Sequence, residues 1–143
     1  MKKLISTLVF SAMAAGAGMA HAQSTILVEF QGPGGHSSSN YGRTSALHAA
    51  ARSVMALQKA GLPAGSYAVT DLTGGNSVNS IASDGKFVVT LNTQSGVSPS
   101  DFLSKVTEAA KTGAAAENAF RNVKAGDLTA GAPADIRYAV KPQ

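Results

Sequence analysis

One short stretch concentrates the residue types that could do chemistry. Positions 32–43 read GPGGHSSSNYGR and place His36 among glycines, with three serines directly after it. Glycine lets the backbone adopt conformations that other residues avoid, and an imidazole can act as an acid, a base or a hydrogen-bond donor near neutral pH. The stretch therefore has the character of part of an active site, provided that other residues complete it.

The rest of the chain does not complete such a site. After residue 22 only one other histidine occurs, His48, within a run typical of a helix surface. No Asp or Glu stands in a His-containing metal-ligand motif, and the absence of cysteine excludes thiol catalysis. Ser37, His36 and Asp71 could form a serine-type triad on paper, but no nucleophile elbow surrounds Ser37. We therefore expect no self-contained enzyme, no metal site and no cofactor.

The first 22 residues are typical of a secretory signal peptide. Lys2 and Lys3 precede an apolar run, and AHA at positions 20–22 places small residues where signal peptidase cleaves. The apolar run is short for a membrane-spanning helix, and no stop-transfer charges follow it. We expect cleavage after Ala22 and a periplasmic or secreted product without a membrane anchor.

Residues 23–143 are enough for one domain and too few for two. Without Lys2 and Lys3 the twelve basic residues become ten, against eight acidic ones, which leaves a net charge of +2. These charges are scattered rather than clustered, so we expect no binding to nucleic acid. With no cysteine and no tryptophan, the core has to be mainly aliphatic.

The pattern of apolar residues predicts four strands and two helices that must position the glycine-rich loop. The predicted strands, each with alternating apolar side chains, cover residues 24–31, 66–72, 86–94 and 134–141. One predicted helix runs over residues 45–61, with Thr44 or Ser45 as its cap and Met55 at the border of its apolar stripe. A second helix begins at Ser98, and Gly113 leaves open whether residues 114–123 continue it.

The order βαββαβ predicts an α+β fold, the ferredoxin-like sandwich. In this fold a four-stranded antiparallel sheet carries two helices on one face. On the last strand we expect Ile136, Tyr138 and Val140 to share the covered face. The other face, which carries Glu29 and Arg137 among others, is expected to be solvated or used for contact.

Two segments together resemble a known family of domains. Residues 28–57 and 69–93 contain Gly-Gly-His-Ser before a helix, Ser-Ala-Leu-His in its first turn and Gly-Gly-x-x-x-Asn before the third strand. In this order they resemble the lid, or dimerisation, domain of zinc-dependent exopeptidases and amidohydrolases. That family includes tripeptide aminopeptidase, carboxypeptidase G and succinyl-diaminopimelate desuccinylase.

The resemblance implies roles for particular residues. The family's loop histidine, matched here by His36, reaches the active site of the neighbouring subunit and there contacts the scissile carbonyl or the oxyanion. The family's asparagine, matched by Asn79, lies near bound substrate. Four glycines are expected to serve loop geometry, namely Gly34, Gly35, Gly74 and Gly75.

The chain also departs from the family pattern. Ala82 stands where the family usually has proline, and Asn92 stands where it commonly has an arginine that can clamp a substrate carboxylate. No zinc ligands flank the resembling segment, and the predicted signal peptide directly precedes its first strand. We therefore expect a lid domain without the catalytic domain of its family.

Two functions follow as hypotheses. The first is an exported, stand-alone and non-catalytic module that forms homodimers through an edge strand and the adjacent helix. The second is an accessory subunit that donates His36 in trans to a separately encoded zinc metallopeptidase or amidohydrolase. The sequence leaves open which sheet edge a dimer would use.

Overall fold

Six longer elements form the body of this computed structural model, which describes residues 24–143. In chain order they are β1 (Thr25–Gln31), α2 (Ala46–Gln58), β3 (Tyr67–Gly74), β5 (Asp84–Leu91), α3 (Pro99–Phe120) and β8 (Arg137–Pro142). Their sequence of types is βαββαβ, as the apolar patterns predict. The predicted signal peptide, residues 1–22, lies outside the described residues.

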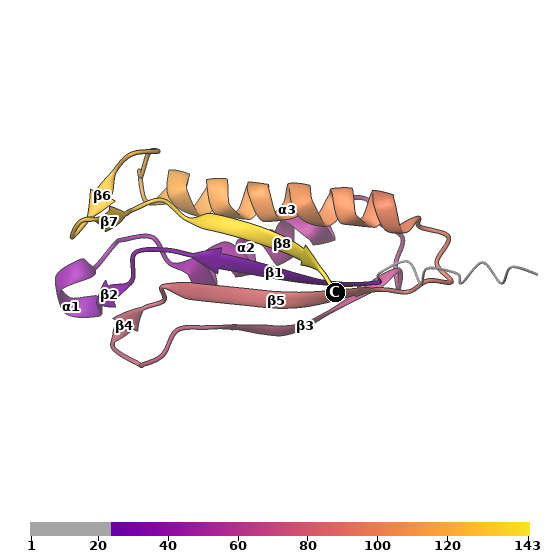
Figure 1. Ribbon diagram of the computed structural model, residues 1–143, viewed down its shortest axis with the longest axis horizontal. Coiled ribbons are helices and arrows are strands. Elements are labelled where there is room, and N and C mark those ends of the chain that lie inside the picture. Colours follow the sequence, from indigo (N-terminus) through magenta and orange to yellow (C-terminus); the bar gives the residue numbers. More distant parts are fainter. Residues whose placement is uncertain (1–23) are drawn as a thin grey trace, which may run out of the picture.

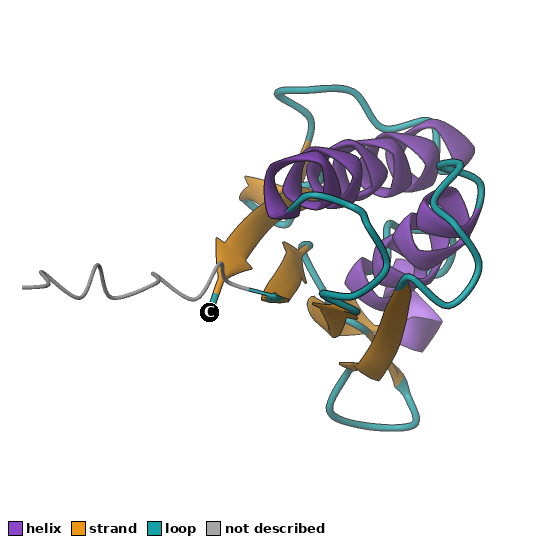
Figure 2. Ribbon diagram, turned by 90° about the vertical axis from the view of Figure 1, so that its right-hand side faces the viewer, coloured by secondary structure: helices purple, strands orange, loops and turns teal. Residues whose placement is uncertain are grey.

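The four strands form one antiparallel sheet in the order β3-β5-β1-β8. Both long helices lie on the same face of this sheet, which Figure 2 shows end-on. The predicted ferredoxin-like sandwich is therefore confirmed. Because β5 and β1 are central, the sheet has two open edges, one along β3 and one along β8.

The core lies between the sheet and the helices. Alternate residues of β1 and β5 point into it, among them Val28 and Phe87, which are fully buried. The helix α2 covers the β5 and β3 side of the sheet, and α3 covers the β8 side. Burying a side chain of this size stabilises a fold by roughly 1.5–3 kcal/mol. Because only one face of the sheet carries these apolar side chains, both helices pack on that face and the domain has two layers.

Each long helix begins at a serine that caps it. Ser45 Oγ accepts a hydrogen bond from the N–H of His48 at 3.3 Å, and Ser98 Oγ accepts from Asp101 at 3.1 Å. Pro99 occupies the first turn of α3, where no N–H is needed. The helix α3 continues through Gly113 to Phe120, so residues 114–120 extend it and only residues 121–123 lie beyond.

At Gly113 the helix α3 packs closely against α2. A Cβ atom at this position would lie 2.5 Å from the backbone nitrogen of Ser53 and 2.7 Å from the carbonyl oxygen of Ala49, both on α2. Carbon atoms do not approach backbone atoms so closely. The glycine is therefore required by packing rather than by a helix break.

Two apolar residues are more exposed than the sequence patterns predict. Met55 is 55% exposed because it lies on the flank of α2, beyond the part that covers the sheet. Tyr138 is 39% exposed because β8 is an edge strand, although its ring still packs against Phe30. The other face of the sheet, which the sequence predicts to be solvated, is exposed at Thr70, Thr90 and Arg137.

The long strands separate two ends of the molecule (Figure 1). At one end Gln143 donates its N–H to the carbonyl oxygen of Thr25, so β1 begins beside the end of β8. At the other, which we call the distal end, lie the short elements β2 (Gly35–His36), α1 (Ser37–Asn40), β4 (Ser80–Ile81), β6 (Leu128–Thr129) and β7 (Ala132–Pro133). Within residues 24–143, no helix combines the length and the apolar character needed to cross a membrane.

Candidate functional site

The glycine-rich loop carries His36 to the distal end. Directly after β1 the backbone takes positive φ angles of 67° at Gly34 and 124° at Gly35, which glycine adopts without strain. A side chain at Gly35 would also collide with that of Asn40. The loop then forms β2, whose pairing with β4 places His36 opposite Ser80.

The second glycine pair shapes the neighbouring loop. Gly75 has a φ of 81°, and its N–H donates to the carboxylate of Asp84 at 3.3 Å. Gly74 has ordinary backbone angles, but a Cβ there would lie 2.5 Å from the carbonyl oxygen of Asp84. This loop leads to Asn79, whose carbonyl oxygen accepts the N–H of Ser37 at 2.9 Å.

His36 caps the short helix α1 with its side chain. Its Nδ1 accepts the N–H of Ser38 at 3.2 Å and lies 2.8 Å from the Ser38 hydroxyl. The side-chain amide of Asn40 donates to the His36 carbonyl oxygen at 2.8 Å. The imidazole is therefore held in one orientation while it remains exposed.

The Nε2 atom of His36 lies 3.2 Å from the side-chain amide of Asn79. Because a backbone N–H can only donate, the bond from Ser38 leaves Nδ1 without a proton, and a neutral ring carries its proton on Nε2. The oxygen and the NH2 group of a side-chain amide are assigned from their hydrogen-bond partners. With its oxygen toward the ring, the Asn79 amide accepts a hydrogen bond from Nε2–H of His36, and its NH2 group faces Ser77 Oγ, 2.9 Å away. The two matched family positions thus form one hydrogen-bonded pair.

The structure separates the other residues considered for chemistry from this pair. Asp71 lies on β3, where it accepts a hydrogen bond from Thr70, and it is not a partner of His36. Asn92 follows the opposite end of β5 and stabilises a turn, since its Oδ1 accepts the N–H of Gln94 at 3.1 Å. Among residues 24–143, no three His, Asp or Glu side chains converge as metal ligands would.

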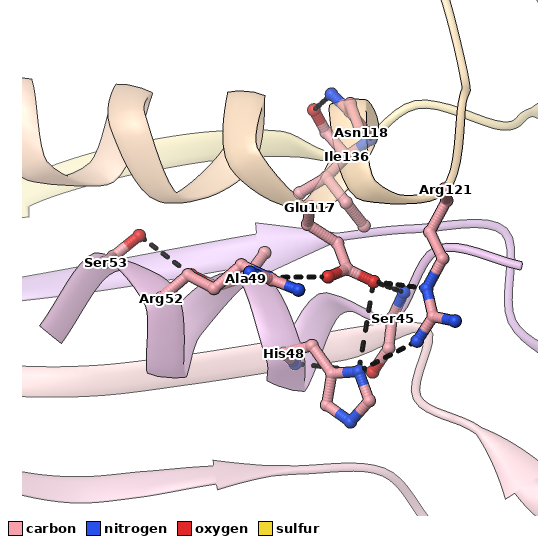
Figure 3. A network of polar contacts seen from close by, with 9 residues as sticks. All are labelled: Ser45, His48, Ala49, Arg52, Ser53, Glu117, Asn118, Arg121 and Ile136. Carbon is pink, nitrogen blue, oxygen red and sulfur yellow. Dashed lines mark hydrogen bonds and ion pairs between the residues drawn. The ribbon is translucent and has the colours of Figure 1, made fainter. Parts of the chain in front are cut away.

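A second polar cluster lies near the distal end, around a carboxylate that the sequence did not single out. Glu117 on α3 is fully buried and receives hydrogen bonds from three directions (Figure 3). The N–H of Ser45 donates to it at 3.1 Å, Arg52 Nε at 2.9 Å and Arg121 Nε at 3.1 Å. His48 Nδ1 lies 3.3 Å from the guanidinium of Arg121. The carboxylate thus joins the start of α2 to the end of α3.

These contacts decide the ionisation of Glu117. Burial by itself raises the pKa of a carboxyl group, because it removes water from the charged form. Here the hydrogen bonds from Ser45, Arg52 and Arg121 outweigh burial, and the net result is a pKa below the ordinary value of 4.5. The group is therefore a carboxylate at neutral pH.

The lowered pKa predicts a loss of stability in acid. Protons bind preferentially to the unfolded chain, where the Glu117 carboxyl has its ordinary, higher pKa. The contribution to the free energy of unfolding is complete above the unfolded-state value of 4.5 and declines as the pH falls through the folded-state pKa. Urea denaturation at a series of pH values should show this decline, and a Glu117→Gln variant should show a shallower one. Equal slopes in the two proteins would contradict the assignment.

Sequence reasoning missed most of this cluster because its members are far apart in the chain. Glu117 bonds to residues 65 and 72 positions away. The one local signal was the spacing of four between Glu117 and Arg121, which places both on one side of a helix. His48, interpreted from sequence as a helix-surface histidine, does have an exposed side chain, but it also borders this cluster.

Comparisons with known proteins agree with this architecture. The family model described as peptidase dimerisation domain matches residues 17–118. A search of curated protein sequences found no match to the chain.

Solved structures with a similar fold come from larger proteins. An aminobenzoyl-glutamate utilization protein from Klebsiella pneumoniae matches with a TM-score of 0.54 and 17% identity, over 82% of this chain and 27% of that one. A hydantoinase/carbamoylase family amidase from Burkholderia ambifaria matches with a TM-score of 0.55 and 20% identity, over 82% and 26%. At this level of identity the likeness shows the fold alone, and the chain spans 26–27% of the length of these proteins.

Proposed function

The chain belongs to the peptidase dimerisation domain family, and from this premise we propose that it is an exported module that forms homodimers and has no catalysis of its own. The observation that carries the proposal is the β3 edge of the sheet, where an open strand lies beside exposed apolar side chains. The proposed periplasmic or secreted location rests on the predicted signal peptide at residues 1–22.

The two edges of the sheet differ in the features that prevent pairing. The β8 edge carries Arg137, Lys141 and Pro142, and charged residues and proline are the usual means of protecting an edge strand. The β3 edge has one charged residue, Asp71, an exposed leucine, Leu72, and a register irregularity between Thr70 and Thr73, which leaves residues 67–70 as its regular part. A second chain would therefore pair more readily with β3.

The flank of α2 next to β3 is also apolar. Leu47 lies 3.1 Å from the place that a Cβ on Gly74 would take, so this side of the helix faces the end of β3. Ala51 and Met55 follow at intervals of four and extend the same stripe. Met55 is 55% exposed, which leaves apolar surface at the border of the sheet.

These features fit a symmetric pair of chains. Two antiparallel β3 strands would hydrogen-bond across a twofold axis, and the flanks of the two α2 helices would pack beside them. Such an arrangement buries the open strand edge and the exposed side chains of Met55 and Leu72 together. The distal ends would stay free to contact other molecules.

We expect lysine at either of two exposed positions to weaken this association. Met55→Lys and Leu72→Lys place a charge in the proposed interface, where its desolvation is unfavourable. The dimer dissociation constant should rise by about tenfold or more, which corresponds to at least about 1.4 kcal/mol. Sedimentation velocity across a range of concentrations measures the change.

Leu128→Lys is the matched control for both variants. Leu128 is 67% exposed on the β6–β7 hairpin at the distal end, so the same change of charge there should leave association unaltered. A wild-type protein that stays monomeric at all concentrations would refute the proposed function. Equal weakening by all three substitutions would refute the choice of the β3 edge.

The second hypothesis, donation of His36 in trans, has one observation in its favour. His36 on β2 and Asn79 beside β4 form an exposed hydrogen-bonded pair at the distal end, opposite the end of the molecule at which β8 finishes (Figure 1). If the bond to Asn79 were exchanged, the Nε2 proton of the neutral imidazole could instead be donated to an oxygen that gains negative charge in a reaction catalysed by another chain.

Affinity capture from the periplasm, followed by metal analysis and a peptide and acyl-amino-acid hydrolysis assay, distinguishes the two hypotheses. Recovery of a metallopeptidase whose turnover falls with His36→Ala would favour donation in trans. Turnover by the purified chain alone, dependent on His36 and a bound metal, would overturn the non-catalytic function.

A further inference from the structure

A hollow of about 640 Å³ at the distal end is not used by the proposed function. It lies between the first turn of α2 and the loop that connects β3 to β4. Its walls contain Arg43, His48 and Arg121, and none of the residues that line it within positions 24–143 is acidic. The apolar residues Leu47 and Ile81 also line it.

Arg43 is a cation without an anionic partner in this hollow. Its side chain is half-buried, and its guanidinium donates to the amide oxygen of Asn40, which is neutral. In the described part of the chain, no carboxylate lies within ion-pair distance of Arg43. Partial burial strengthens the field of such a charge, because less water screens it.

Arg121 contributes a second positive charge that is only partly balanced. Its Nε donates to Glu117, but the same carboxylate also pairs with Arg52. One carboxylate between two guanidinium groups leaves a net positive charge. Glu117 itself is fully buried beneath the cluster, so no ligand in the hollow would meet its negative charge directly.

His48 adds a hydrogen-bond donor to the same wall. A guanidinium group can only donate, so Nδ1 of His48 is the acceptor of the 3.3 Å contact with Arg121. The proton of the neutral ring is therefore on Nε2. The hydroxyl group of Ser37 also lines the hollow and can donate.

From this arrangement we propose that the hollow binds a small oxyanion, a carboxylate or phosphate group, through Arg43 and Arg121. Guanidinium groups bind both kinds of oxyanion in charge-assisted hydrogen bonds. Leu47 and Ile81 would contact an apolar group attached to the anion. The site adjoins the proposed dimer interface, since Leu47 and Gly74 line it, but the two residues that test the dimer, Leu72 and Met55, do not.

NMR titration of the 15N-labelled mature chain tests the site with three probes at constant ionic strength, namely inorganic phosphate, acetate and hexanoate. We expect saturable shifts of the arginine Nε–H signals and of backbone amides around the hollow. Tighter binding of hexanoate than of acetate would assign the ligand to carboxylates with an apolar group. Saturation by phosphate alone would assign it to phosphates. Either result supports the site.

Arg43→Gln is the informative variant because Arg43 takes no part in the Glu117 cluster. It should weaken binding by about tenfold or more, the usual effect of removing a hydrogen bond to a charged group. Arg137→Gln is the control, since it removes the same charge from the exposed face of the sheet. The absence of saturable shifts with all three probes would overturn the proposal. Equal weakening by the two variants would also overturn it, because the interaction would then be non-specific.

Discussion

Replacement of Glu117 by glutamine is expected to lower the free energy of unfolding by about 3 kcal/mol. Removing one member of a buried ion pair costs about 3–5 kcal/mol, because the partner charge is left uncompensated. The lower end of that range applies here, since the side chains of Arg52 and Arg121 remain 33% and 21% exposed. Glutamine keeps one acceptor for Ser45 but offers no charge to either arginine.

Urea denaturation followed by circular dichroism measures this effect at pH 7. Glu108→Gln is the control, because Glu108 lies on the same helix and is exposed. That variant should stay within about 0.5 kcal/mol of the wild type. If Glu117→Gln were equally mild, the carboxylate would not be the link between α2 and α3 that its hydrogen bonds indicate.

Replacement of Gly113 by alanine is expected to destabilise the fold, although alanine is the better helix former. The added methyl group would overlap with the backbone of α2 at Ser53 and Ala49, so the two helices would have to separate. Overpacking of this kind costs about 1–3 kcal/mol, and the gain in helix propensity is about 1 kcal/mol. Because backbone atoms of α2 obstruct the methyl group in addition to the Ser53 hydroxyl, we expect the upper end of the difference, a net loss of about 2 kcal/mol.

The Ala115→Gly variant measures how much helix propensity alone contributes to the free energy of unfolding in this helix. Ala115 is exposed on the same helix, so its replacement should cost about 1 kcal/mol through propensity alone. Thermal and urea denaturation of both variants give the comparison. A Gly113→Ala protein that is more stable than the wild type would show that the helices can move apart at little cost.

Both substitutions act at the contact between α2 and α3, which also supports the distal end. Arg121 and His48, bound to each other in the Glu117 cluster, form one wall of the proposed oxyanion site. Loss of Glu117 would therefore be expected to alter that site as well as stability. Arg43 lies outside the cluster, so Arg43→Gln should weaken anion binding without lowering the stability of the fold.

Much of the fold could be predicted because its signals are local. The alternation in STILVEFQ and the capping serines Ser45 and Ser98 each depend on a few consecutive residues. Gly113 shows the limit of such reasoning. Sequence alone left open whether it ends the helix, and only the approach of α2 shows that the position needs a residue without a side chain.

In the candidate site, too, some residues could be identified from the sequence, whereas their contacts could not. The glycine-rich loop, His36 and Asn79 could be identified from motifs, but their contact joins residues 43 positions apart and depends on the pairing of β2 with β4. The Glu117 cluster had almost no local signal, and neither did the grouping of Arg43, His48 and Arg121 around one hollow. Such groupings arise when helices dock on a sheet and bring distant side chains together.

The sequence by itself determined the order of the elements, the face that each turns to the core and the family to which the chain belongs. These properties follow from periodicity and motifs within short segments. The tertiary structure alone decided which strands lie at the edges of the sheet, which charges are balanced and which donors share one hollow. Those properties depend on distances between residues remote in the chain, and packing of the two layers sets these distances.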